Sequence, residues 1–411
     1  MSIGWQIRAA LCICVVAYLS GIVAASETYV PLSLAGSAST TPSADIDSFR
    51  LPSGDLPHDG LARFFRGKKL FETDIVRQLT QERGIAPRLR NGNGCSDCHL
   101  GGGRNAVKDE SERAFPLAPI VVRLPPPGAK STAPDDVRTA SDAASFAQAA
   151  KISWHTTQRL IDGHEYSLVY PRVTMNGAVV DGARVRITPS LIGLGLLEEI
   201  NDEDILDWYR GHRLGRVPQV KSSSVPDRIG HFGLQSTSVS VLDFVGTALH
   251  DELGIVDQSV LSKAQVEDLA YYASELGVPR RQMQNPQIAA GYEIFERLGC
   301  SNCHRPSYEV RRQNGSDSFS MTIWPFSDLL IHDLSYPGSG GGHEFWRTTP
   351  LWGLGRVEKA LGYGAYMHDG RARTLEEAII WHGGEAALSR FLFIESTNDA
   401  RLALLAFLQS L

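Results

Sequence analysis

Two copies of the pentapeptide Cys-x-x-Cys-His stand far apart in this chain of 411 residues. The copies are Cys95-Ser96-Asp97-Cys98-His99 and Cys300-Ser301-Asn302-Cys303-His304. This spacing is the attachment signature of c-type haem, in which both thiols bind one porphyrin covalently and the histidine ligates its iron. The sequence therefore predicts two covalently bound haems, with His99 and His304 as the proximal iron ligands. Two irons that exchange electrons indicate a redox function.

Two other uses of paired cysteines fit the sequence less well. Four cysteines in two pairs can hold zinc, but these pairs lie far outside the usual zinc-ribbon spacing, and zinc gives no reason for a histidine after each pair. A thioredoxin-like dithiol needs one pair near a βαβ pattern, which the sequence lacks. Two further cysteines, Cys12 and Cys14, lie in a predicted export signal, so none is left over for a structural disulfide.

The N-terminus has the features of an export signal. Arg8 supplies the positive charge, residues 9–22 are apolar, and Val23-Ala24-Ala25 supplies small residues for cleavage. Because a bilayer span needs ~20 apolar residues, a cleaved signal peptide over residues 1–25 is favoured over an uncleaved anchor. No stable membrane span is expected after cleavage. Bacteria attach c-type haem outside the cytoplasmic membrane, so the sequence predicts an exported, periplasmic protein.

Composition predicts a folded protein of more than one domain. Hydrophobic residues make up 43% of the chain, which is too many for a disordered protein. The net charge of −6 gives no reason to expect nucleic-acid binding. A flexible lead-in is expected over 26–57, an N-terminal haem domain with insertions over 58–278, and a C-terminal cytochrome c-like haem domain over 287–411. The predicted fold class is mainly α, with two cytochrome c-like domains, long irregular loops and a few short strands.

A weak internal repeat indicates two related haem units. Residues 67–71 read Gly-Lys-Lys-Leu-Phe before the first haem site, and residues 291–295 read Gly-Tyr-Glu-Ile-Phe before the second. Both are typical of one face of a short helix, although chance similarity between two amphipathic stretches is the alternative. Other elements are also expected. They are helices at 202–210, 262–276 and 398–411, a short strand at 179–187, and loops at about 101–150.

His382 is the candidate for the second axial ligand of the C-terminal haem. Thr374 and Glu377 form a capping box that begins a helix, and two glycines after His382 end it. Leu375, Ile379 and His382 share one helix face, which is apolar apart from the histidine. The histidine therefore points inward, either as an iron ligand or as a core residue. Ligation by two histidines would give a lower potential than His/Met ligation.

Arg347 is the candidate for a contact with the haem itself. A buried arginine here would pair with a haem propionate, whereas a surface arginine would have no such role. Four tryptophans lie in the same third of the chain, where each either packs in the core or relays an electron between haems. They are Trp324, Trp346, Trp352 and Trp381.

Several segments resemble a known family. They are residues 324–333, which contain Asp-Leu-Leu-Ile-His-Asp, residues 347–355, which read Arg-Thr-Thr-Pro-Leu-Trp-Gly-Leu-Gly, residues 368–379, which begin His-Asp-Gly-Arg, and residues 192–200. They resemble the di-haem oxidoreductase family of peroxidase-like proteins, also called thiol oxidoreductase-like. This family is distantly related to the bacterial di-haem cytochrome c peroxidases. The resemblance covers both haem sites and most of the C-terminal domain, whereas residues 100–185 match poorly.

The resemblance has implications for the distal ligand of the C-terminal haem and for calcium. In the related peroxidases the distal ligand of the C-terminal haem, commonly methionine, follows the histidine of the His-Asp-Gly segment by fourteen residues, and here that position is His382. Residues 230–235 read Gly-His-Phe-Gly-Leu-Gln where the family usually has Gly-Arg-Phe-Gly-Trp-Lys. Residues 219–226 contain no carboxylate where many members have Asp-Gly-Asp-Gly. The calcium ion common in the related peroxidases is therefore not supported.

Peroxidase chemistry requires one haem with an open face. The haem at His99 is the candidate, because the sequence offers no strong distal ligand for it. Candidate acid–base groups are His155, His164 and Glu165, and candidate ligands that would close the face are His231 and His250. No motif distinguishes these residues from ordinary surface or structural ones, so no catalytic residue is assigned.

The sequence thus predicts a peroxidase-like di-haem oxidoreductase in which electrons pass from the C-terminal haem to the N-terminal haem. The expected partners are a small redox protein or a quinol-linked electron donor, together with peroxide or another small oxidant. A di-haem electron carrier without a catalytic haem is the alternative function, and a haem-stabilised binding protein is a third.

Covalent haem attachment is directly measurable. The mature protein should carry the added mass of two haem groups and should stain for haem after denaturing electrophoresis. Replacing both Cys95 and Cys98 by alanine should remove one group and leave the other, since each site binds its own porphyrin. A mass without any added haem would contradict the interpretation as a whole.

Overall fold

The computed structural model describes the chain from residue 34 onward, with several gaps. The described residues are 34–41, 49–83, 92–99, 120–123, 150–175, 177–180, 183–220, 228–255, 260–314, 317–335, 345–361 and 364–411. The described residues belong to one compact unit. The predicted signal peptide and most of the loop region expected at 101–150 lie outside the described residues. Within the described stretches, no helix has the length and apolar character that crossing a membrane requires.

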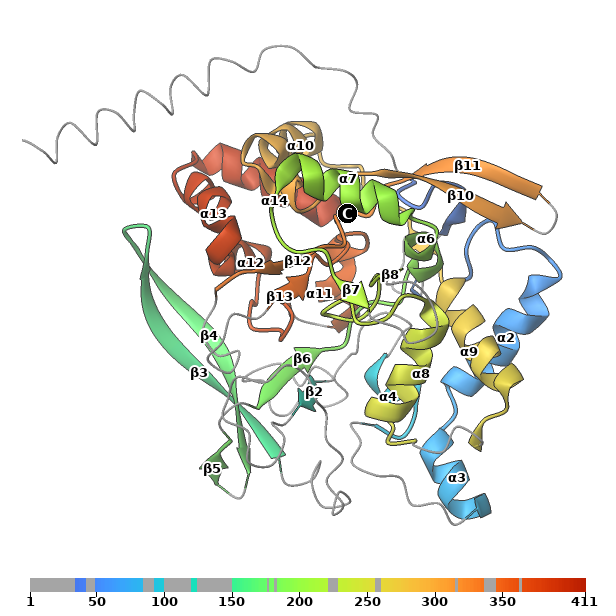
Figure 1. Ribbon diagram of the computed structural model, residues 1–411. Coiled ribbons are helices and arrows are strands. Elements are labelled where there is room, and N and C mark those ends of the chain that lie inside the picture. The colour runs from blue at the N-terminus through green and yellow to red at the C-terminus, as the bar shows by residue number, and fades with distance from the viewer. Residues whose placement is uncertain are drawn as a thin grey trace, which may run out of the picture. The chain divides into compact units, whose positions relative to one another are not determined.

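Helices and strands are interspersed along the chain (Figure 1). The helices are α2 (Gly60–Phe71), α3 (Ile75–Arg83), α4 (Cys95–Cys98), α6 (Leu194–Glu198), α7 (Asp202–His212), α8 (Val241–Asp251), α9 (Lys263–Ser274), α10 (Ile288–Arg297), α11 (Val357–Leu361), α12 (Leu375–Trp381), α13 (Ala387–Ile394) and α14 (Asn398–Ser410). Four short 3₁₀ turns are η1 (Ser37–Ser39), η6 (Cys300–Asn302), η7 (Leu354–Arg356) and η8 (Gly384–Ala386). The strands are β1 (Thr40–Thr41), β2 (Ile120–Arg123), β3 (Ala150–Ile161), β4 (His164–Met175), β5 (Ala178–Val179), β6 (Arg184–Ile187), β7 (Gln219–Val220), β8 (Arg228–Ile229), β9 (Val278–Pro279), β10 (Tyr308–Asn314), β11 (Asp317–Ile323), β12 (Ile331–Asp333) and β13 (Phe345–Arg347).

The prediction of a mainly α fold is wrong, because the described residues combine helices with six small sheets. β3 and β4 form a long antiparallel hairpin with twelve residues in each strand, and β5 extends it. β10 and β11 form a second hairpin with seven residues in each strand. The remaining sheets are pairs of short strands. The fold is therefore mixed α and β, and the predicted cytochrome c-like architecture does not describe it.

The turn residues of the long hairpin favour its formation, and helical periodicity does not reveal them. Asp162 and Gly163 connect β3 to β4, and both have positive φ angles, 50° and 88°. A two-residue turn of this kind matches the twist of the flanking strands and favours Asp-Gly. An ion pair fixes the tip to α13, since Nε of Arg390 lies 3.0 Å from a carboxylate oxygen of Asp162. Figure 1 shows the hairpin reaching toward α12 and α13.

The expected helices are confirmed as α7, α9 and α14, and the expected strand at 179–187 is found as the two short strands β5 and β6. α9 begins at the predicted capping box. The hydroxyl of Ser262 accepts a hydrogen bond from the backbone N–H of Gln265, whose side chain accepts one from the N–H of Ser262. These elements were predictable because capping and helical periodicity are local properties of the sequence.

The two sequence repeats lie at equivalent helix crossings. α2 packs on α9, and α10 packs on α14. At each crossing the glycine of the repeat lets two backbones approach closely. A Cβ on Gly67 would lie 2.0 Å from the carbonyl oxygen of Asp268 in α9, and a Cβ on Gly291 would lie 2.0 Å from that of Ala403 in α14. Glycine is thus required at both positions by steric contact rather than by its φ angle.

The phenylalanine that ends each repeat lies between its helix crossing and the histidine of the following Cys-x-x-Cys-His segment. The ring of Phe71 lies 5.0 Å from that of Tyr272 in α9 and 6.1 Å from that of His99, measured between centroids. The ring of Phe295 lies 5.2 Å from that of Phe407 in α14 and 6.3 Å from that of His304. The similarity in sequence therefore corresponds to a similarity in structure: a glycine at the crossing and an aromatic ring against the histidine.

Part of the segment expected to be a flexible lead-in contributes to the core. β1 pairs in parallel with β9, and Thr41 is fully buried. Arg312 of β10 forms ion pairs with Asp55 and with Glu275, which follows α9. Since these three side chains are largely excluded from solvent, removing one partner would leave an unpaired buried charge. These ion pairs connect the segment around Asp55 to β10 and to the end of α9.

We expect Gly67→Ala and Gly291→Ala each to lower the free energy of unfolding by about 1–3 kcal/mol, because the new methyl group would collide with backbone of the crossing helix. Gly246→Ala is the matched control, since this exposed helical glycine of α8 has open space around its Cβ position. It should stabilise the protein by about 0.5–1 kcal/mol through the higher helix propensity of alanine. Denaturant titration measures all three, and unchanged stability of Gly291→Ala would contradict the proposed crossing.

Candidate haem sites

The first Cys-x-x-Cys-His segment forms the short helix α4, which ends at His99. The carboxylate of Asp97 accepts hydrogen bonds from the backbone N–H groups of Asn93 and Gly94, at 2.8 and 3.3 Å, and so caps the turn. Gly94 must be small, because a Cβ would lie 2.5 Å from the carbonyl oxygen of Thr73. These contacts fix the turn that carries both cysteines and the histidine.

A cavity of about 350 Å³ opens beside this segment. Such a volume is within the range of small-molecule and cofactor sites. Most of its wall is apolar, and α2, α8 and α9 contribute part of it. Its lining includes Phe71, Cys95, Cys98, His99, Arg186, Ile187, Pro189, Leu191, Leu234, Gln235, Thr237, Phe244, Val245, Leu249, Glu252 and Leu269. The wall thus combines both thiols and the imidazole with a few polar groups, which is the composition that a porphyrin site requires.

Burial favours the uncharged forms of the histidine and cysteines at this cavity. Burial lowers the pKa of His99 to about 4, although the nearby carbonyl of Pro189 opposes the shift. That carbonyl does not complete a hydrogen bond, so Nδ1 of His99 is buried without a partner. Burial also raises the pKa of Cys95 and of Cys98 to about 12. A neutral imidazole and two protonated thiols therefore face the cavity at neutral pH.

The described lining of this cavity contains one histidine, His99, and no methionine. None of the four other histidines considered as acid–base groups or ligands belongs to it. Both ring nitrogens of His231 are engaged, one with the carbonyl of Leu197 and the other with Asp202. His250 is half-exposed and pairs with Asp251. His155 and His164 belong to the β3–β4 hairpin, with Glu165 beside His164. The polar side chains that do line the cavity, such as Arg186, Gln235 and Glu252, were missed because they belong to no motif.

The second Cys-x-x-Cys-His segment begins with the 3₁₀ turn η6 and ends at His304. The turn follows Gly299, whose φ of 76° is in the left-handed region that favours glycine. Nδ1 of His304 lies 2.9 Å from the carbonyl oxygen of Phe326. A carbonyl can only accept, so Nδ1 carries the proton and Nε2 is left with a lone pair. Burial lowers the pKa of His304 to about 4, and the ring is neutral.

His382 ends α12 and lies opposite His304. Their ring centroids are 6.4 Å apart, with an angle of 49° between the ring planes. Nδ1 of His382 donates to the carbonyl of Ala378 at 2.6 Å, which again leaves Nε2 free. Two imidazoles that bind one metal ion at about 2 Å each have centroids about 6 Å apart. The residues present therefore fit an iron held between the two rings, and the role of His382 as its ligand stays a prediction.

The start of α12 matches the sequence prediction in part. The hydroxyl of Thr374 accepts a hydrogen bond from the backbone N–H of Glu377, as predicted. The carboxylate of Glu377 accepts from the backbone N–H of Arg373 instead of completing a capping box with Thr374. The helix ends before two glycines as expected, and Gly384 has a φ of 52°.

Arg347 is buried, with 5% of its surface exposed, and contacts the wall of the first cavity. Its guanidinium donates to the backbone carbonyls of His231 and Gly233. Its own N–H donates to the carbonyl of Leu234. Within the described part of the chain it forms no ion pair with a carboxylate, and burial lowers the pKa of Arg347 to about 10. A buried cation of this kind suits an anionic propionate of the first haem, and that contact stays a prediction.

The four tryptophans occupy different surroundings. Trp346, Trp352 and Trp381 are buried, and Trp324 packs against the core. Trp346 stacks on His368 at a centroid distance of 4.8 Å, and the guanidinium of Arg186 lies 5.4 Å from its ring. Trp346 therefore contacts a residue of the first cavity wall and also pairs across the β12–β13 sheet with His332, close to the second site.

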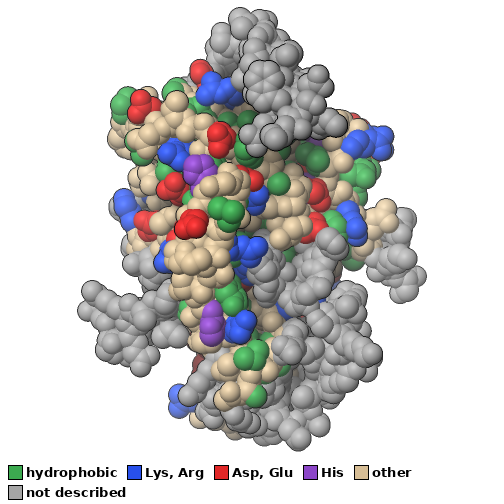
Figure 2. All heavy atoms as spheres, turned by 90° about the vertical axis from the view of Figure 1, so that its left-hand side faces the viewer, with side chains coloured by type: hydrophobic (Ala, Val, Ile, Leu, Met, Phe, Trp, Pro, Cys, Tyr) green, Lys and Arg blue, Asp and Glu red, His purple; other side chains and the backbone are tan. Residues whose placement is uncertain are grey.

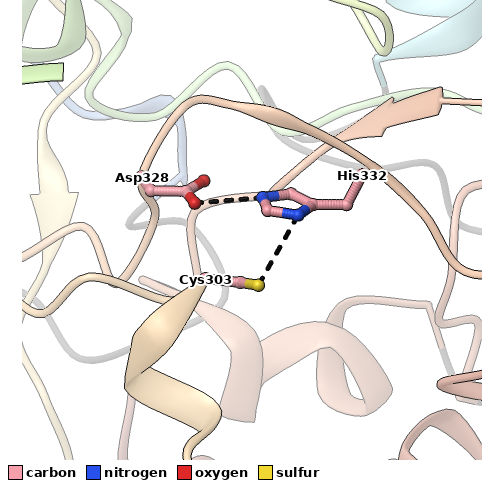
Figure 3. Close-up of side chains that lie close together, drawn as sticks. All are labelled: Cys303, Asp328 and His332. Carbon is pink, nitrogen blue, oxygen red and sulfur yellow. Dashed lines mark hydrogen bonds and ion pairs between the residues drawn. The ribbon is translucent and has the colours of Figure 1, made fainter. Parts of the chain in front are cut away.

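A cluster of charged side chains lies against the second site (Figure 3). His332 is held between two carboxylates, with Nε2 3.0 Å from Asp328 and Nδ1 3.0 Å from Glu385. Nδ1 also lies 3.6 Å from the sulfur of Cys303. Burial disfavours the charge, but hydrogen bonds to Asp328, Cys303 and Glu385 outweigh it and raise the pKa of His332 to about 12. The sequence motif contained Asp328 and His332, but nothing in it pointed to Glu385.

Comparisons with known proteins address the family. Residues 214–411 match the model of a family described as "Di-haem oxidoreductase, putative peroxidase". The predicted resemblance to the di-haem oxidoreductase family is thereby confirmed over residues 214–411. No characterised protein and no solved structure matched the chain. The family description implies haem cofactors. The matched range includes the second Cys-x-x-Cys-His segment but begins after the first.

His332 should remain a doubly protonated imidazolium as the pH rises through its ordinary pKa of about 6.5. Because the folded pKa is raised, the stability that this proton adds is complete below about pH 6.5 and declines as the pH rises toward about 12. Nitrogen NMR of ¹⁵N-labelled histidine measures the state of both ring nitrogens. Asp328→Asn should move the titration of His332 toward its ordinary range. A neutral ring at pH 7 in the parent protein would contradict this assignment.

Proposed function

We propose that the protein is a peroxidase-like di-haem oxidoreductase of the bacterial periplasm, in which electrons pass from the haem at Cys300 and Cys303 to the haem at Cys95 and Cys98. The difference between the two sites carries this proposal. His304 has a second histidine at the distance of a shared metal ion, whereas the described wall around His99 offers no second histidine or methionine.

The second site suits electron transfer. Backbone carbonyls hold both imidazoles in the tautomer that presents Nε2, so little rearrangement is needed when the oxidation state changes. An iron bound by His304 and His382 has no open position for a small oxidant. Ligation by two histidines also lowers the potential relative to His/Met ligation, which favours passing electrons onward.

The first site suits a reaction with a small oxidant. The haem, when bound, supplies the redox chemistry, and the side chains of the cavity supply proton transfer and charge stabilisation. Arg186 donates to the amide oxygen of Gln235 at 3.2 Å, and both line the cavity with Glu252. A cation, an amide and a carboxylate can orient a peroxide, move its proton and stabilise the oxygen that leaves.

β13 connects the wall of the first cavity to the strand beside the second site. Arg347 of β13 donates to the backbone beside Gly233 of the first cavity, and β13 pairs with β12 beside the second site. Trp346 lies on the same strand. This compact connection supports electron exchange between the two haems.

The proposed partners are peroxide or another small oxidant and either a small redox protein or a quinol-linked donor. Figure 2 shows acidic, basic and histidine side chains interspersed over the described part of one face. This mixture gives no single-sign field on that face that would select a strongly charged partner.

The oxidised protein tests the proposal by optical and electron paramagnetic resonance spectroscopy. We expect one low-spin haem and one high-spin haem, with cyanide or peroxide binding only at the high-spin one. Two low-spin haems that bind neither ligand would instead support the electron carrier.

We expect His382→Ala to convert the low-spin haem to a high-spin form, because this change removes one of its two axial imidazoles. Free imidazole should restore the low-spin spectrum. His164→Ala is the matched control, since His164 is exposed on the β3–β4 hairpin and should leave both spectra unchanged. A low-spin second haem that persists in His382→Ala would contradict the assignment of this ligand.

A further inference from the structure

The cluster of Asp328, His332 and Glu385 has a defined net charge. Each ring nitrogen of His332 faces a carboxylate oxygen at 3.0 Å, which is the geometry of two charge-assisted hydrogen bonds. One imidazolium and two carboxylates sum to one negative charge. The side chain of Asp328 is fully buried and that of His332 is 4% exposed, so water screens this charge poorly.

Backbone groups hold the two carboxylates in place. Glu385 accepts from the N–H groups of Gly215, at 2.6 Å, and Asp333, at 3.1 Å. Asp328 accepts from the N–H of Leu330 at 3.0 Å. Such N–H donors stabilise the ionised form of a carboxylate. Hydrogen bonding to His332 and these N–H groups outweighs burial and lowers the pKa of Glu385.

Packing also fixes the position of the imidazolium. Gly215 has a φ of 73°, and a Cβ at this position would lie 2.5 Å from the ring of His332. The chain therefore passes directly over the ring. The three charged groups come from the segment after the second haem site, from β12 and from η8, and they form a rigid cluster rather than a surface ion pair. Burying such a cluster costs desolvation energy that an apolar cluster would not, so its stability gain is small.

The cluster lies next to the porphyrin attachment point. The sulfur of Cys303 is 3.6 Å from Nδ1 of His332, and this sulfur would form a thioether bond to the haem. The backbone N–H of Asp328 donates to the carbonyl of Cys303 at 2.9 Å. Figure 3 shows the side chains of Cys303, Asp328 and His332 close together. The negative charge is thus close to the sulfur through which a haem would be attached.

We propose that the net negative charge of Asp328, His332 and Glu385 lowers the reduction potential of the second haem and thereby makes it a stronger electron donor to the first. Oxidation adds one positive charge to the haem, and a nearby fixed negative charge stabilises that oxidised form. This inference rests on the proposed function, because it assumes a haem at Cys300 and Cys303. It concerns positioning residues that act on the haem through charge and do not touch a substrate.

Spectroelectrochemical titration of the full, haem-loaded protein tests the inference, with Glu385→Gln as the first variant. Glutamine has nearly the shape of glutamate and removes one negative charge, and its single amide oxygen can keep one of the two hydrogen bonds from Gly215 and Asp333. We expect a positive shift in the potential of the second haem, while the potential of the first haem changes less. Glu395→Gln is the matched control: it removes an exposed carboxylate after α13 and should shift neither potential.

Asp328→Asn is the second variant and protects the test against a structural explanation. The parent and both variants are compared below about pH 6.5, the ordinary pKa of histidine, so that His332 keeps its proton. Loss of the negative charge on the opposite side of the ring should then also shift the potential of the second haem upward. Both variants should keep the low-spin spectrum of the parent. Upward shifts in both with unchanged axial ligation support the inference, and unchanged or lowered potentials in both overturn it.

The outcome is separable from that for the proposed function. If both variants shift the potential but the first haem shows no reaction with peroxide, the charge effect holds and the peroxidase-like function fails. If the first haem reacts with peroxide but the potentials of both variants match that of the parent, the function holds and the charge effect fails. A parent protein without haem at Cys300 and Cys303 would overturn both.

Discussion

The arrangement of the second site depends on keeping two imidazoles neutral and correctly turned inside the protein. Removal from water disfavours the charged form of both His304 and His382. A backbone carbonyl then selects the protonated nitrogen on each ring and leaves the opposite nitrogen with a lone pair. The distance between the two rings therefore depends on the relative positions of α12 and the segment around Phe326. The helix cap at Thr374 and the glycines after His382 are local means to that end.

The same principle applies to the helices around each site. Gly67 and Gly291 bring their helices close to α9 and α14. Phe71 and Phe295 pack between these crossings and the rings of His99 and His304. The two sites share this support but differ in what faces the histidine. A second imidazole lies opposite one of them, and a cavity lies beside the other. Equivalent scaffolds thus carry two different coordination environments.

Local sequence signals predicted the features that depend on few neighbouring residues. The pentapeptides, the caps at Ser262 and Thr374 and the family motifs all fall in this group. The turn of the long β3–β4 hairpin is also encoded locally, by Asp162-Gly163. Helical periodicity elsewhere in the sequence predicted a mainly α fold, which is wrong. Other features could not be predicted, because they join distant positions. Arg186 meets Gln235, and His332 meets Glu385, only through the tertiary fold.

The surroundings of Arg347 bear on the order in which the protein is assembled. Its guanidinium has lost water and donates to carbonyls alone within the described residues, so its charge is balanced only by dipoles. An arriving propionate would supply the missing counter-ion. Packing of this core and insertion of the porphyrin are then linked equilibria, and each makes the other more favourable. If a haem binds here, the haem-free polypeptide would accordingly be the form more exposed to proteolysis.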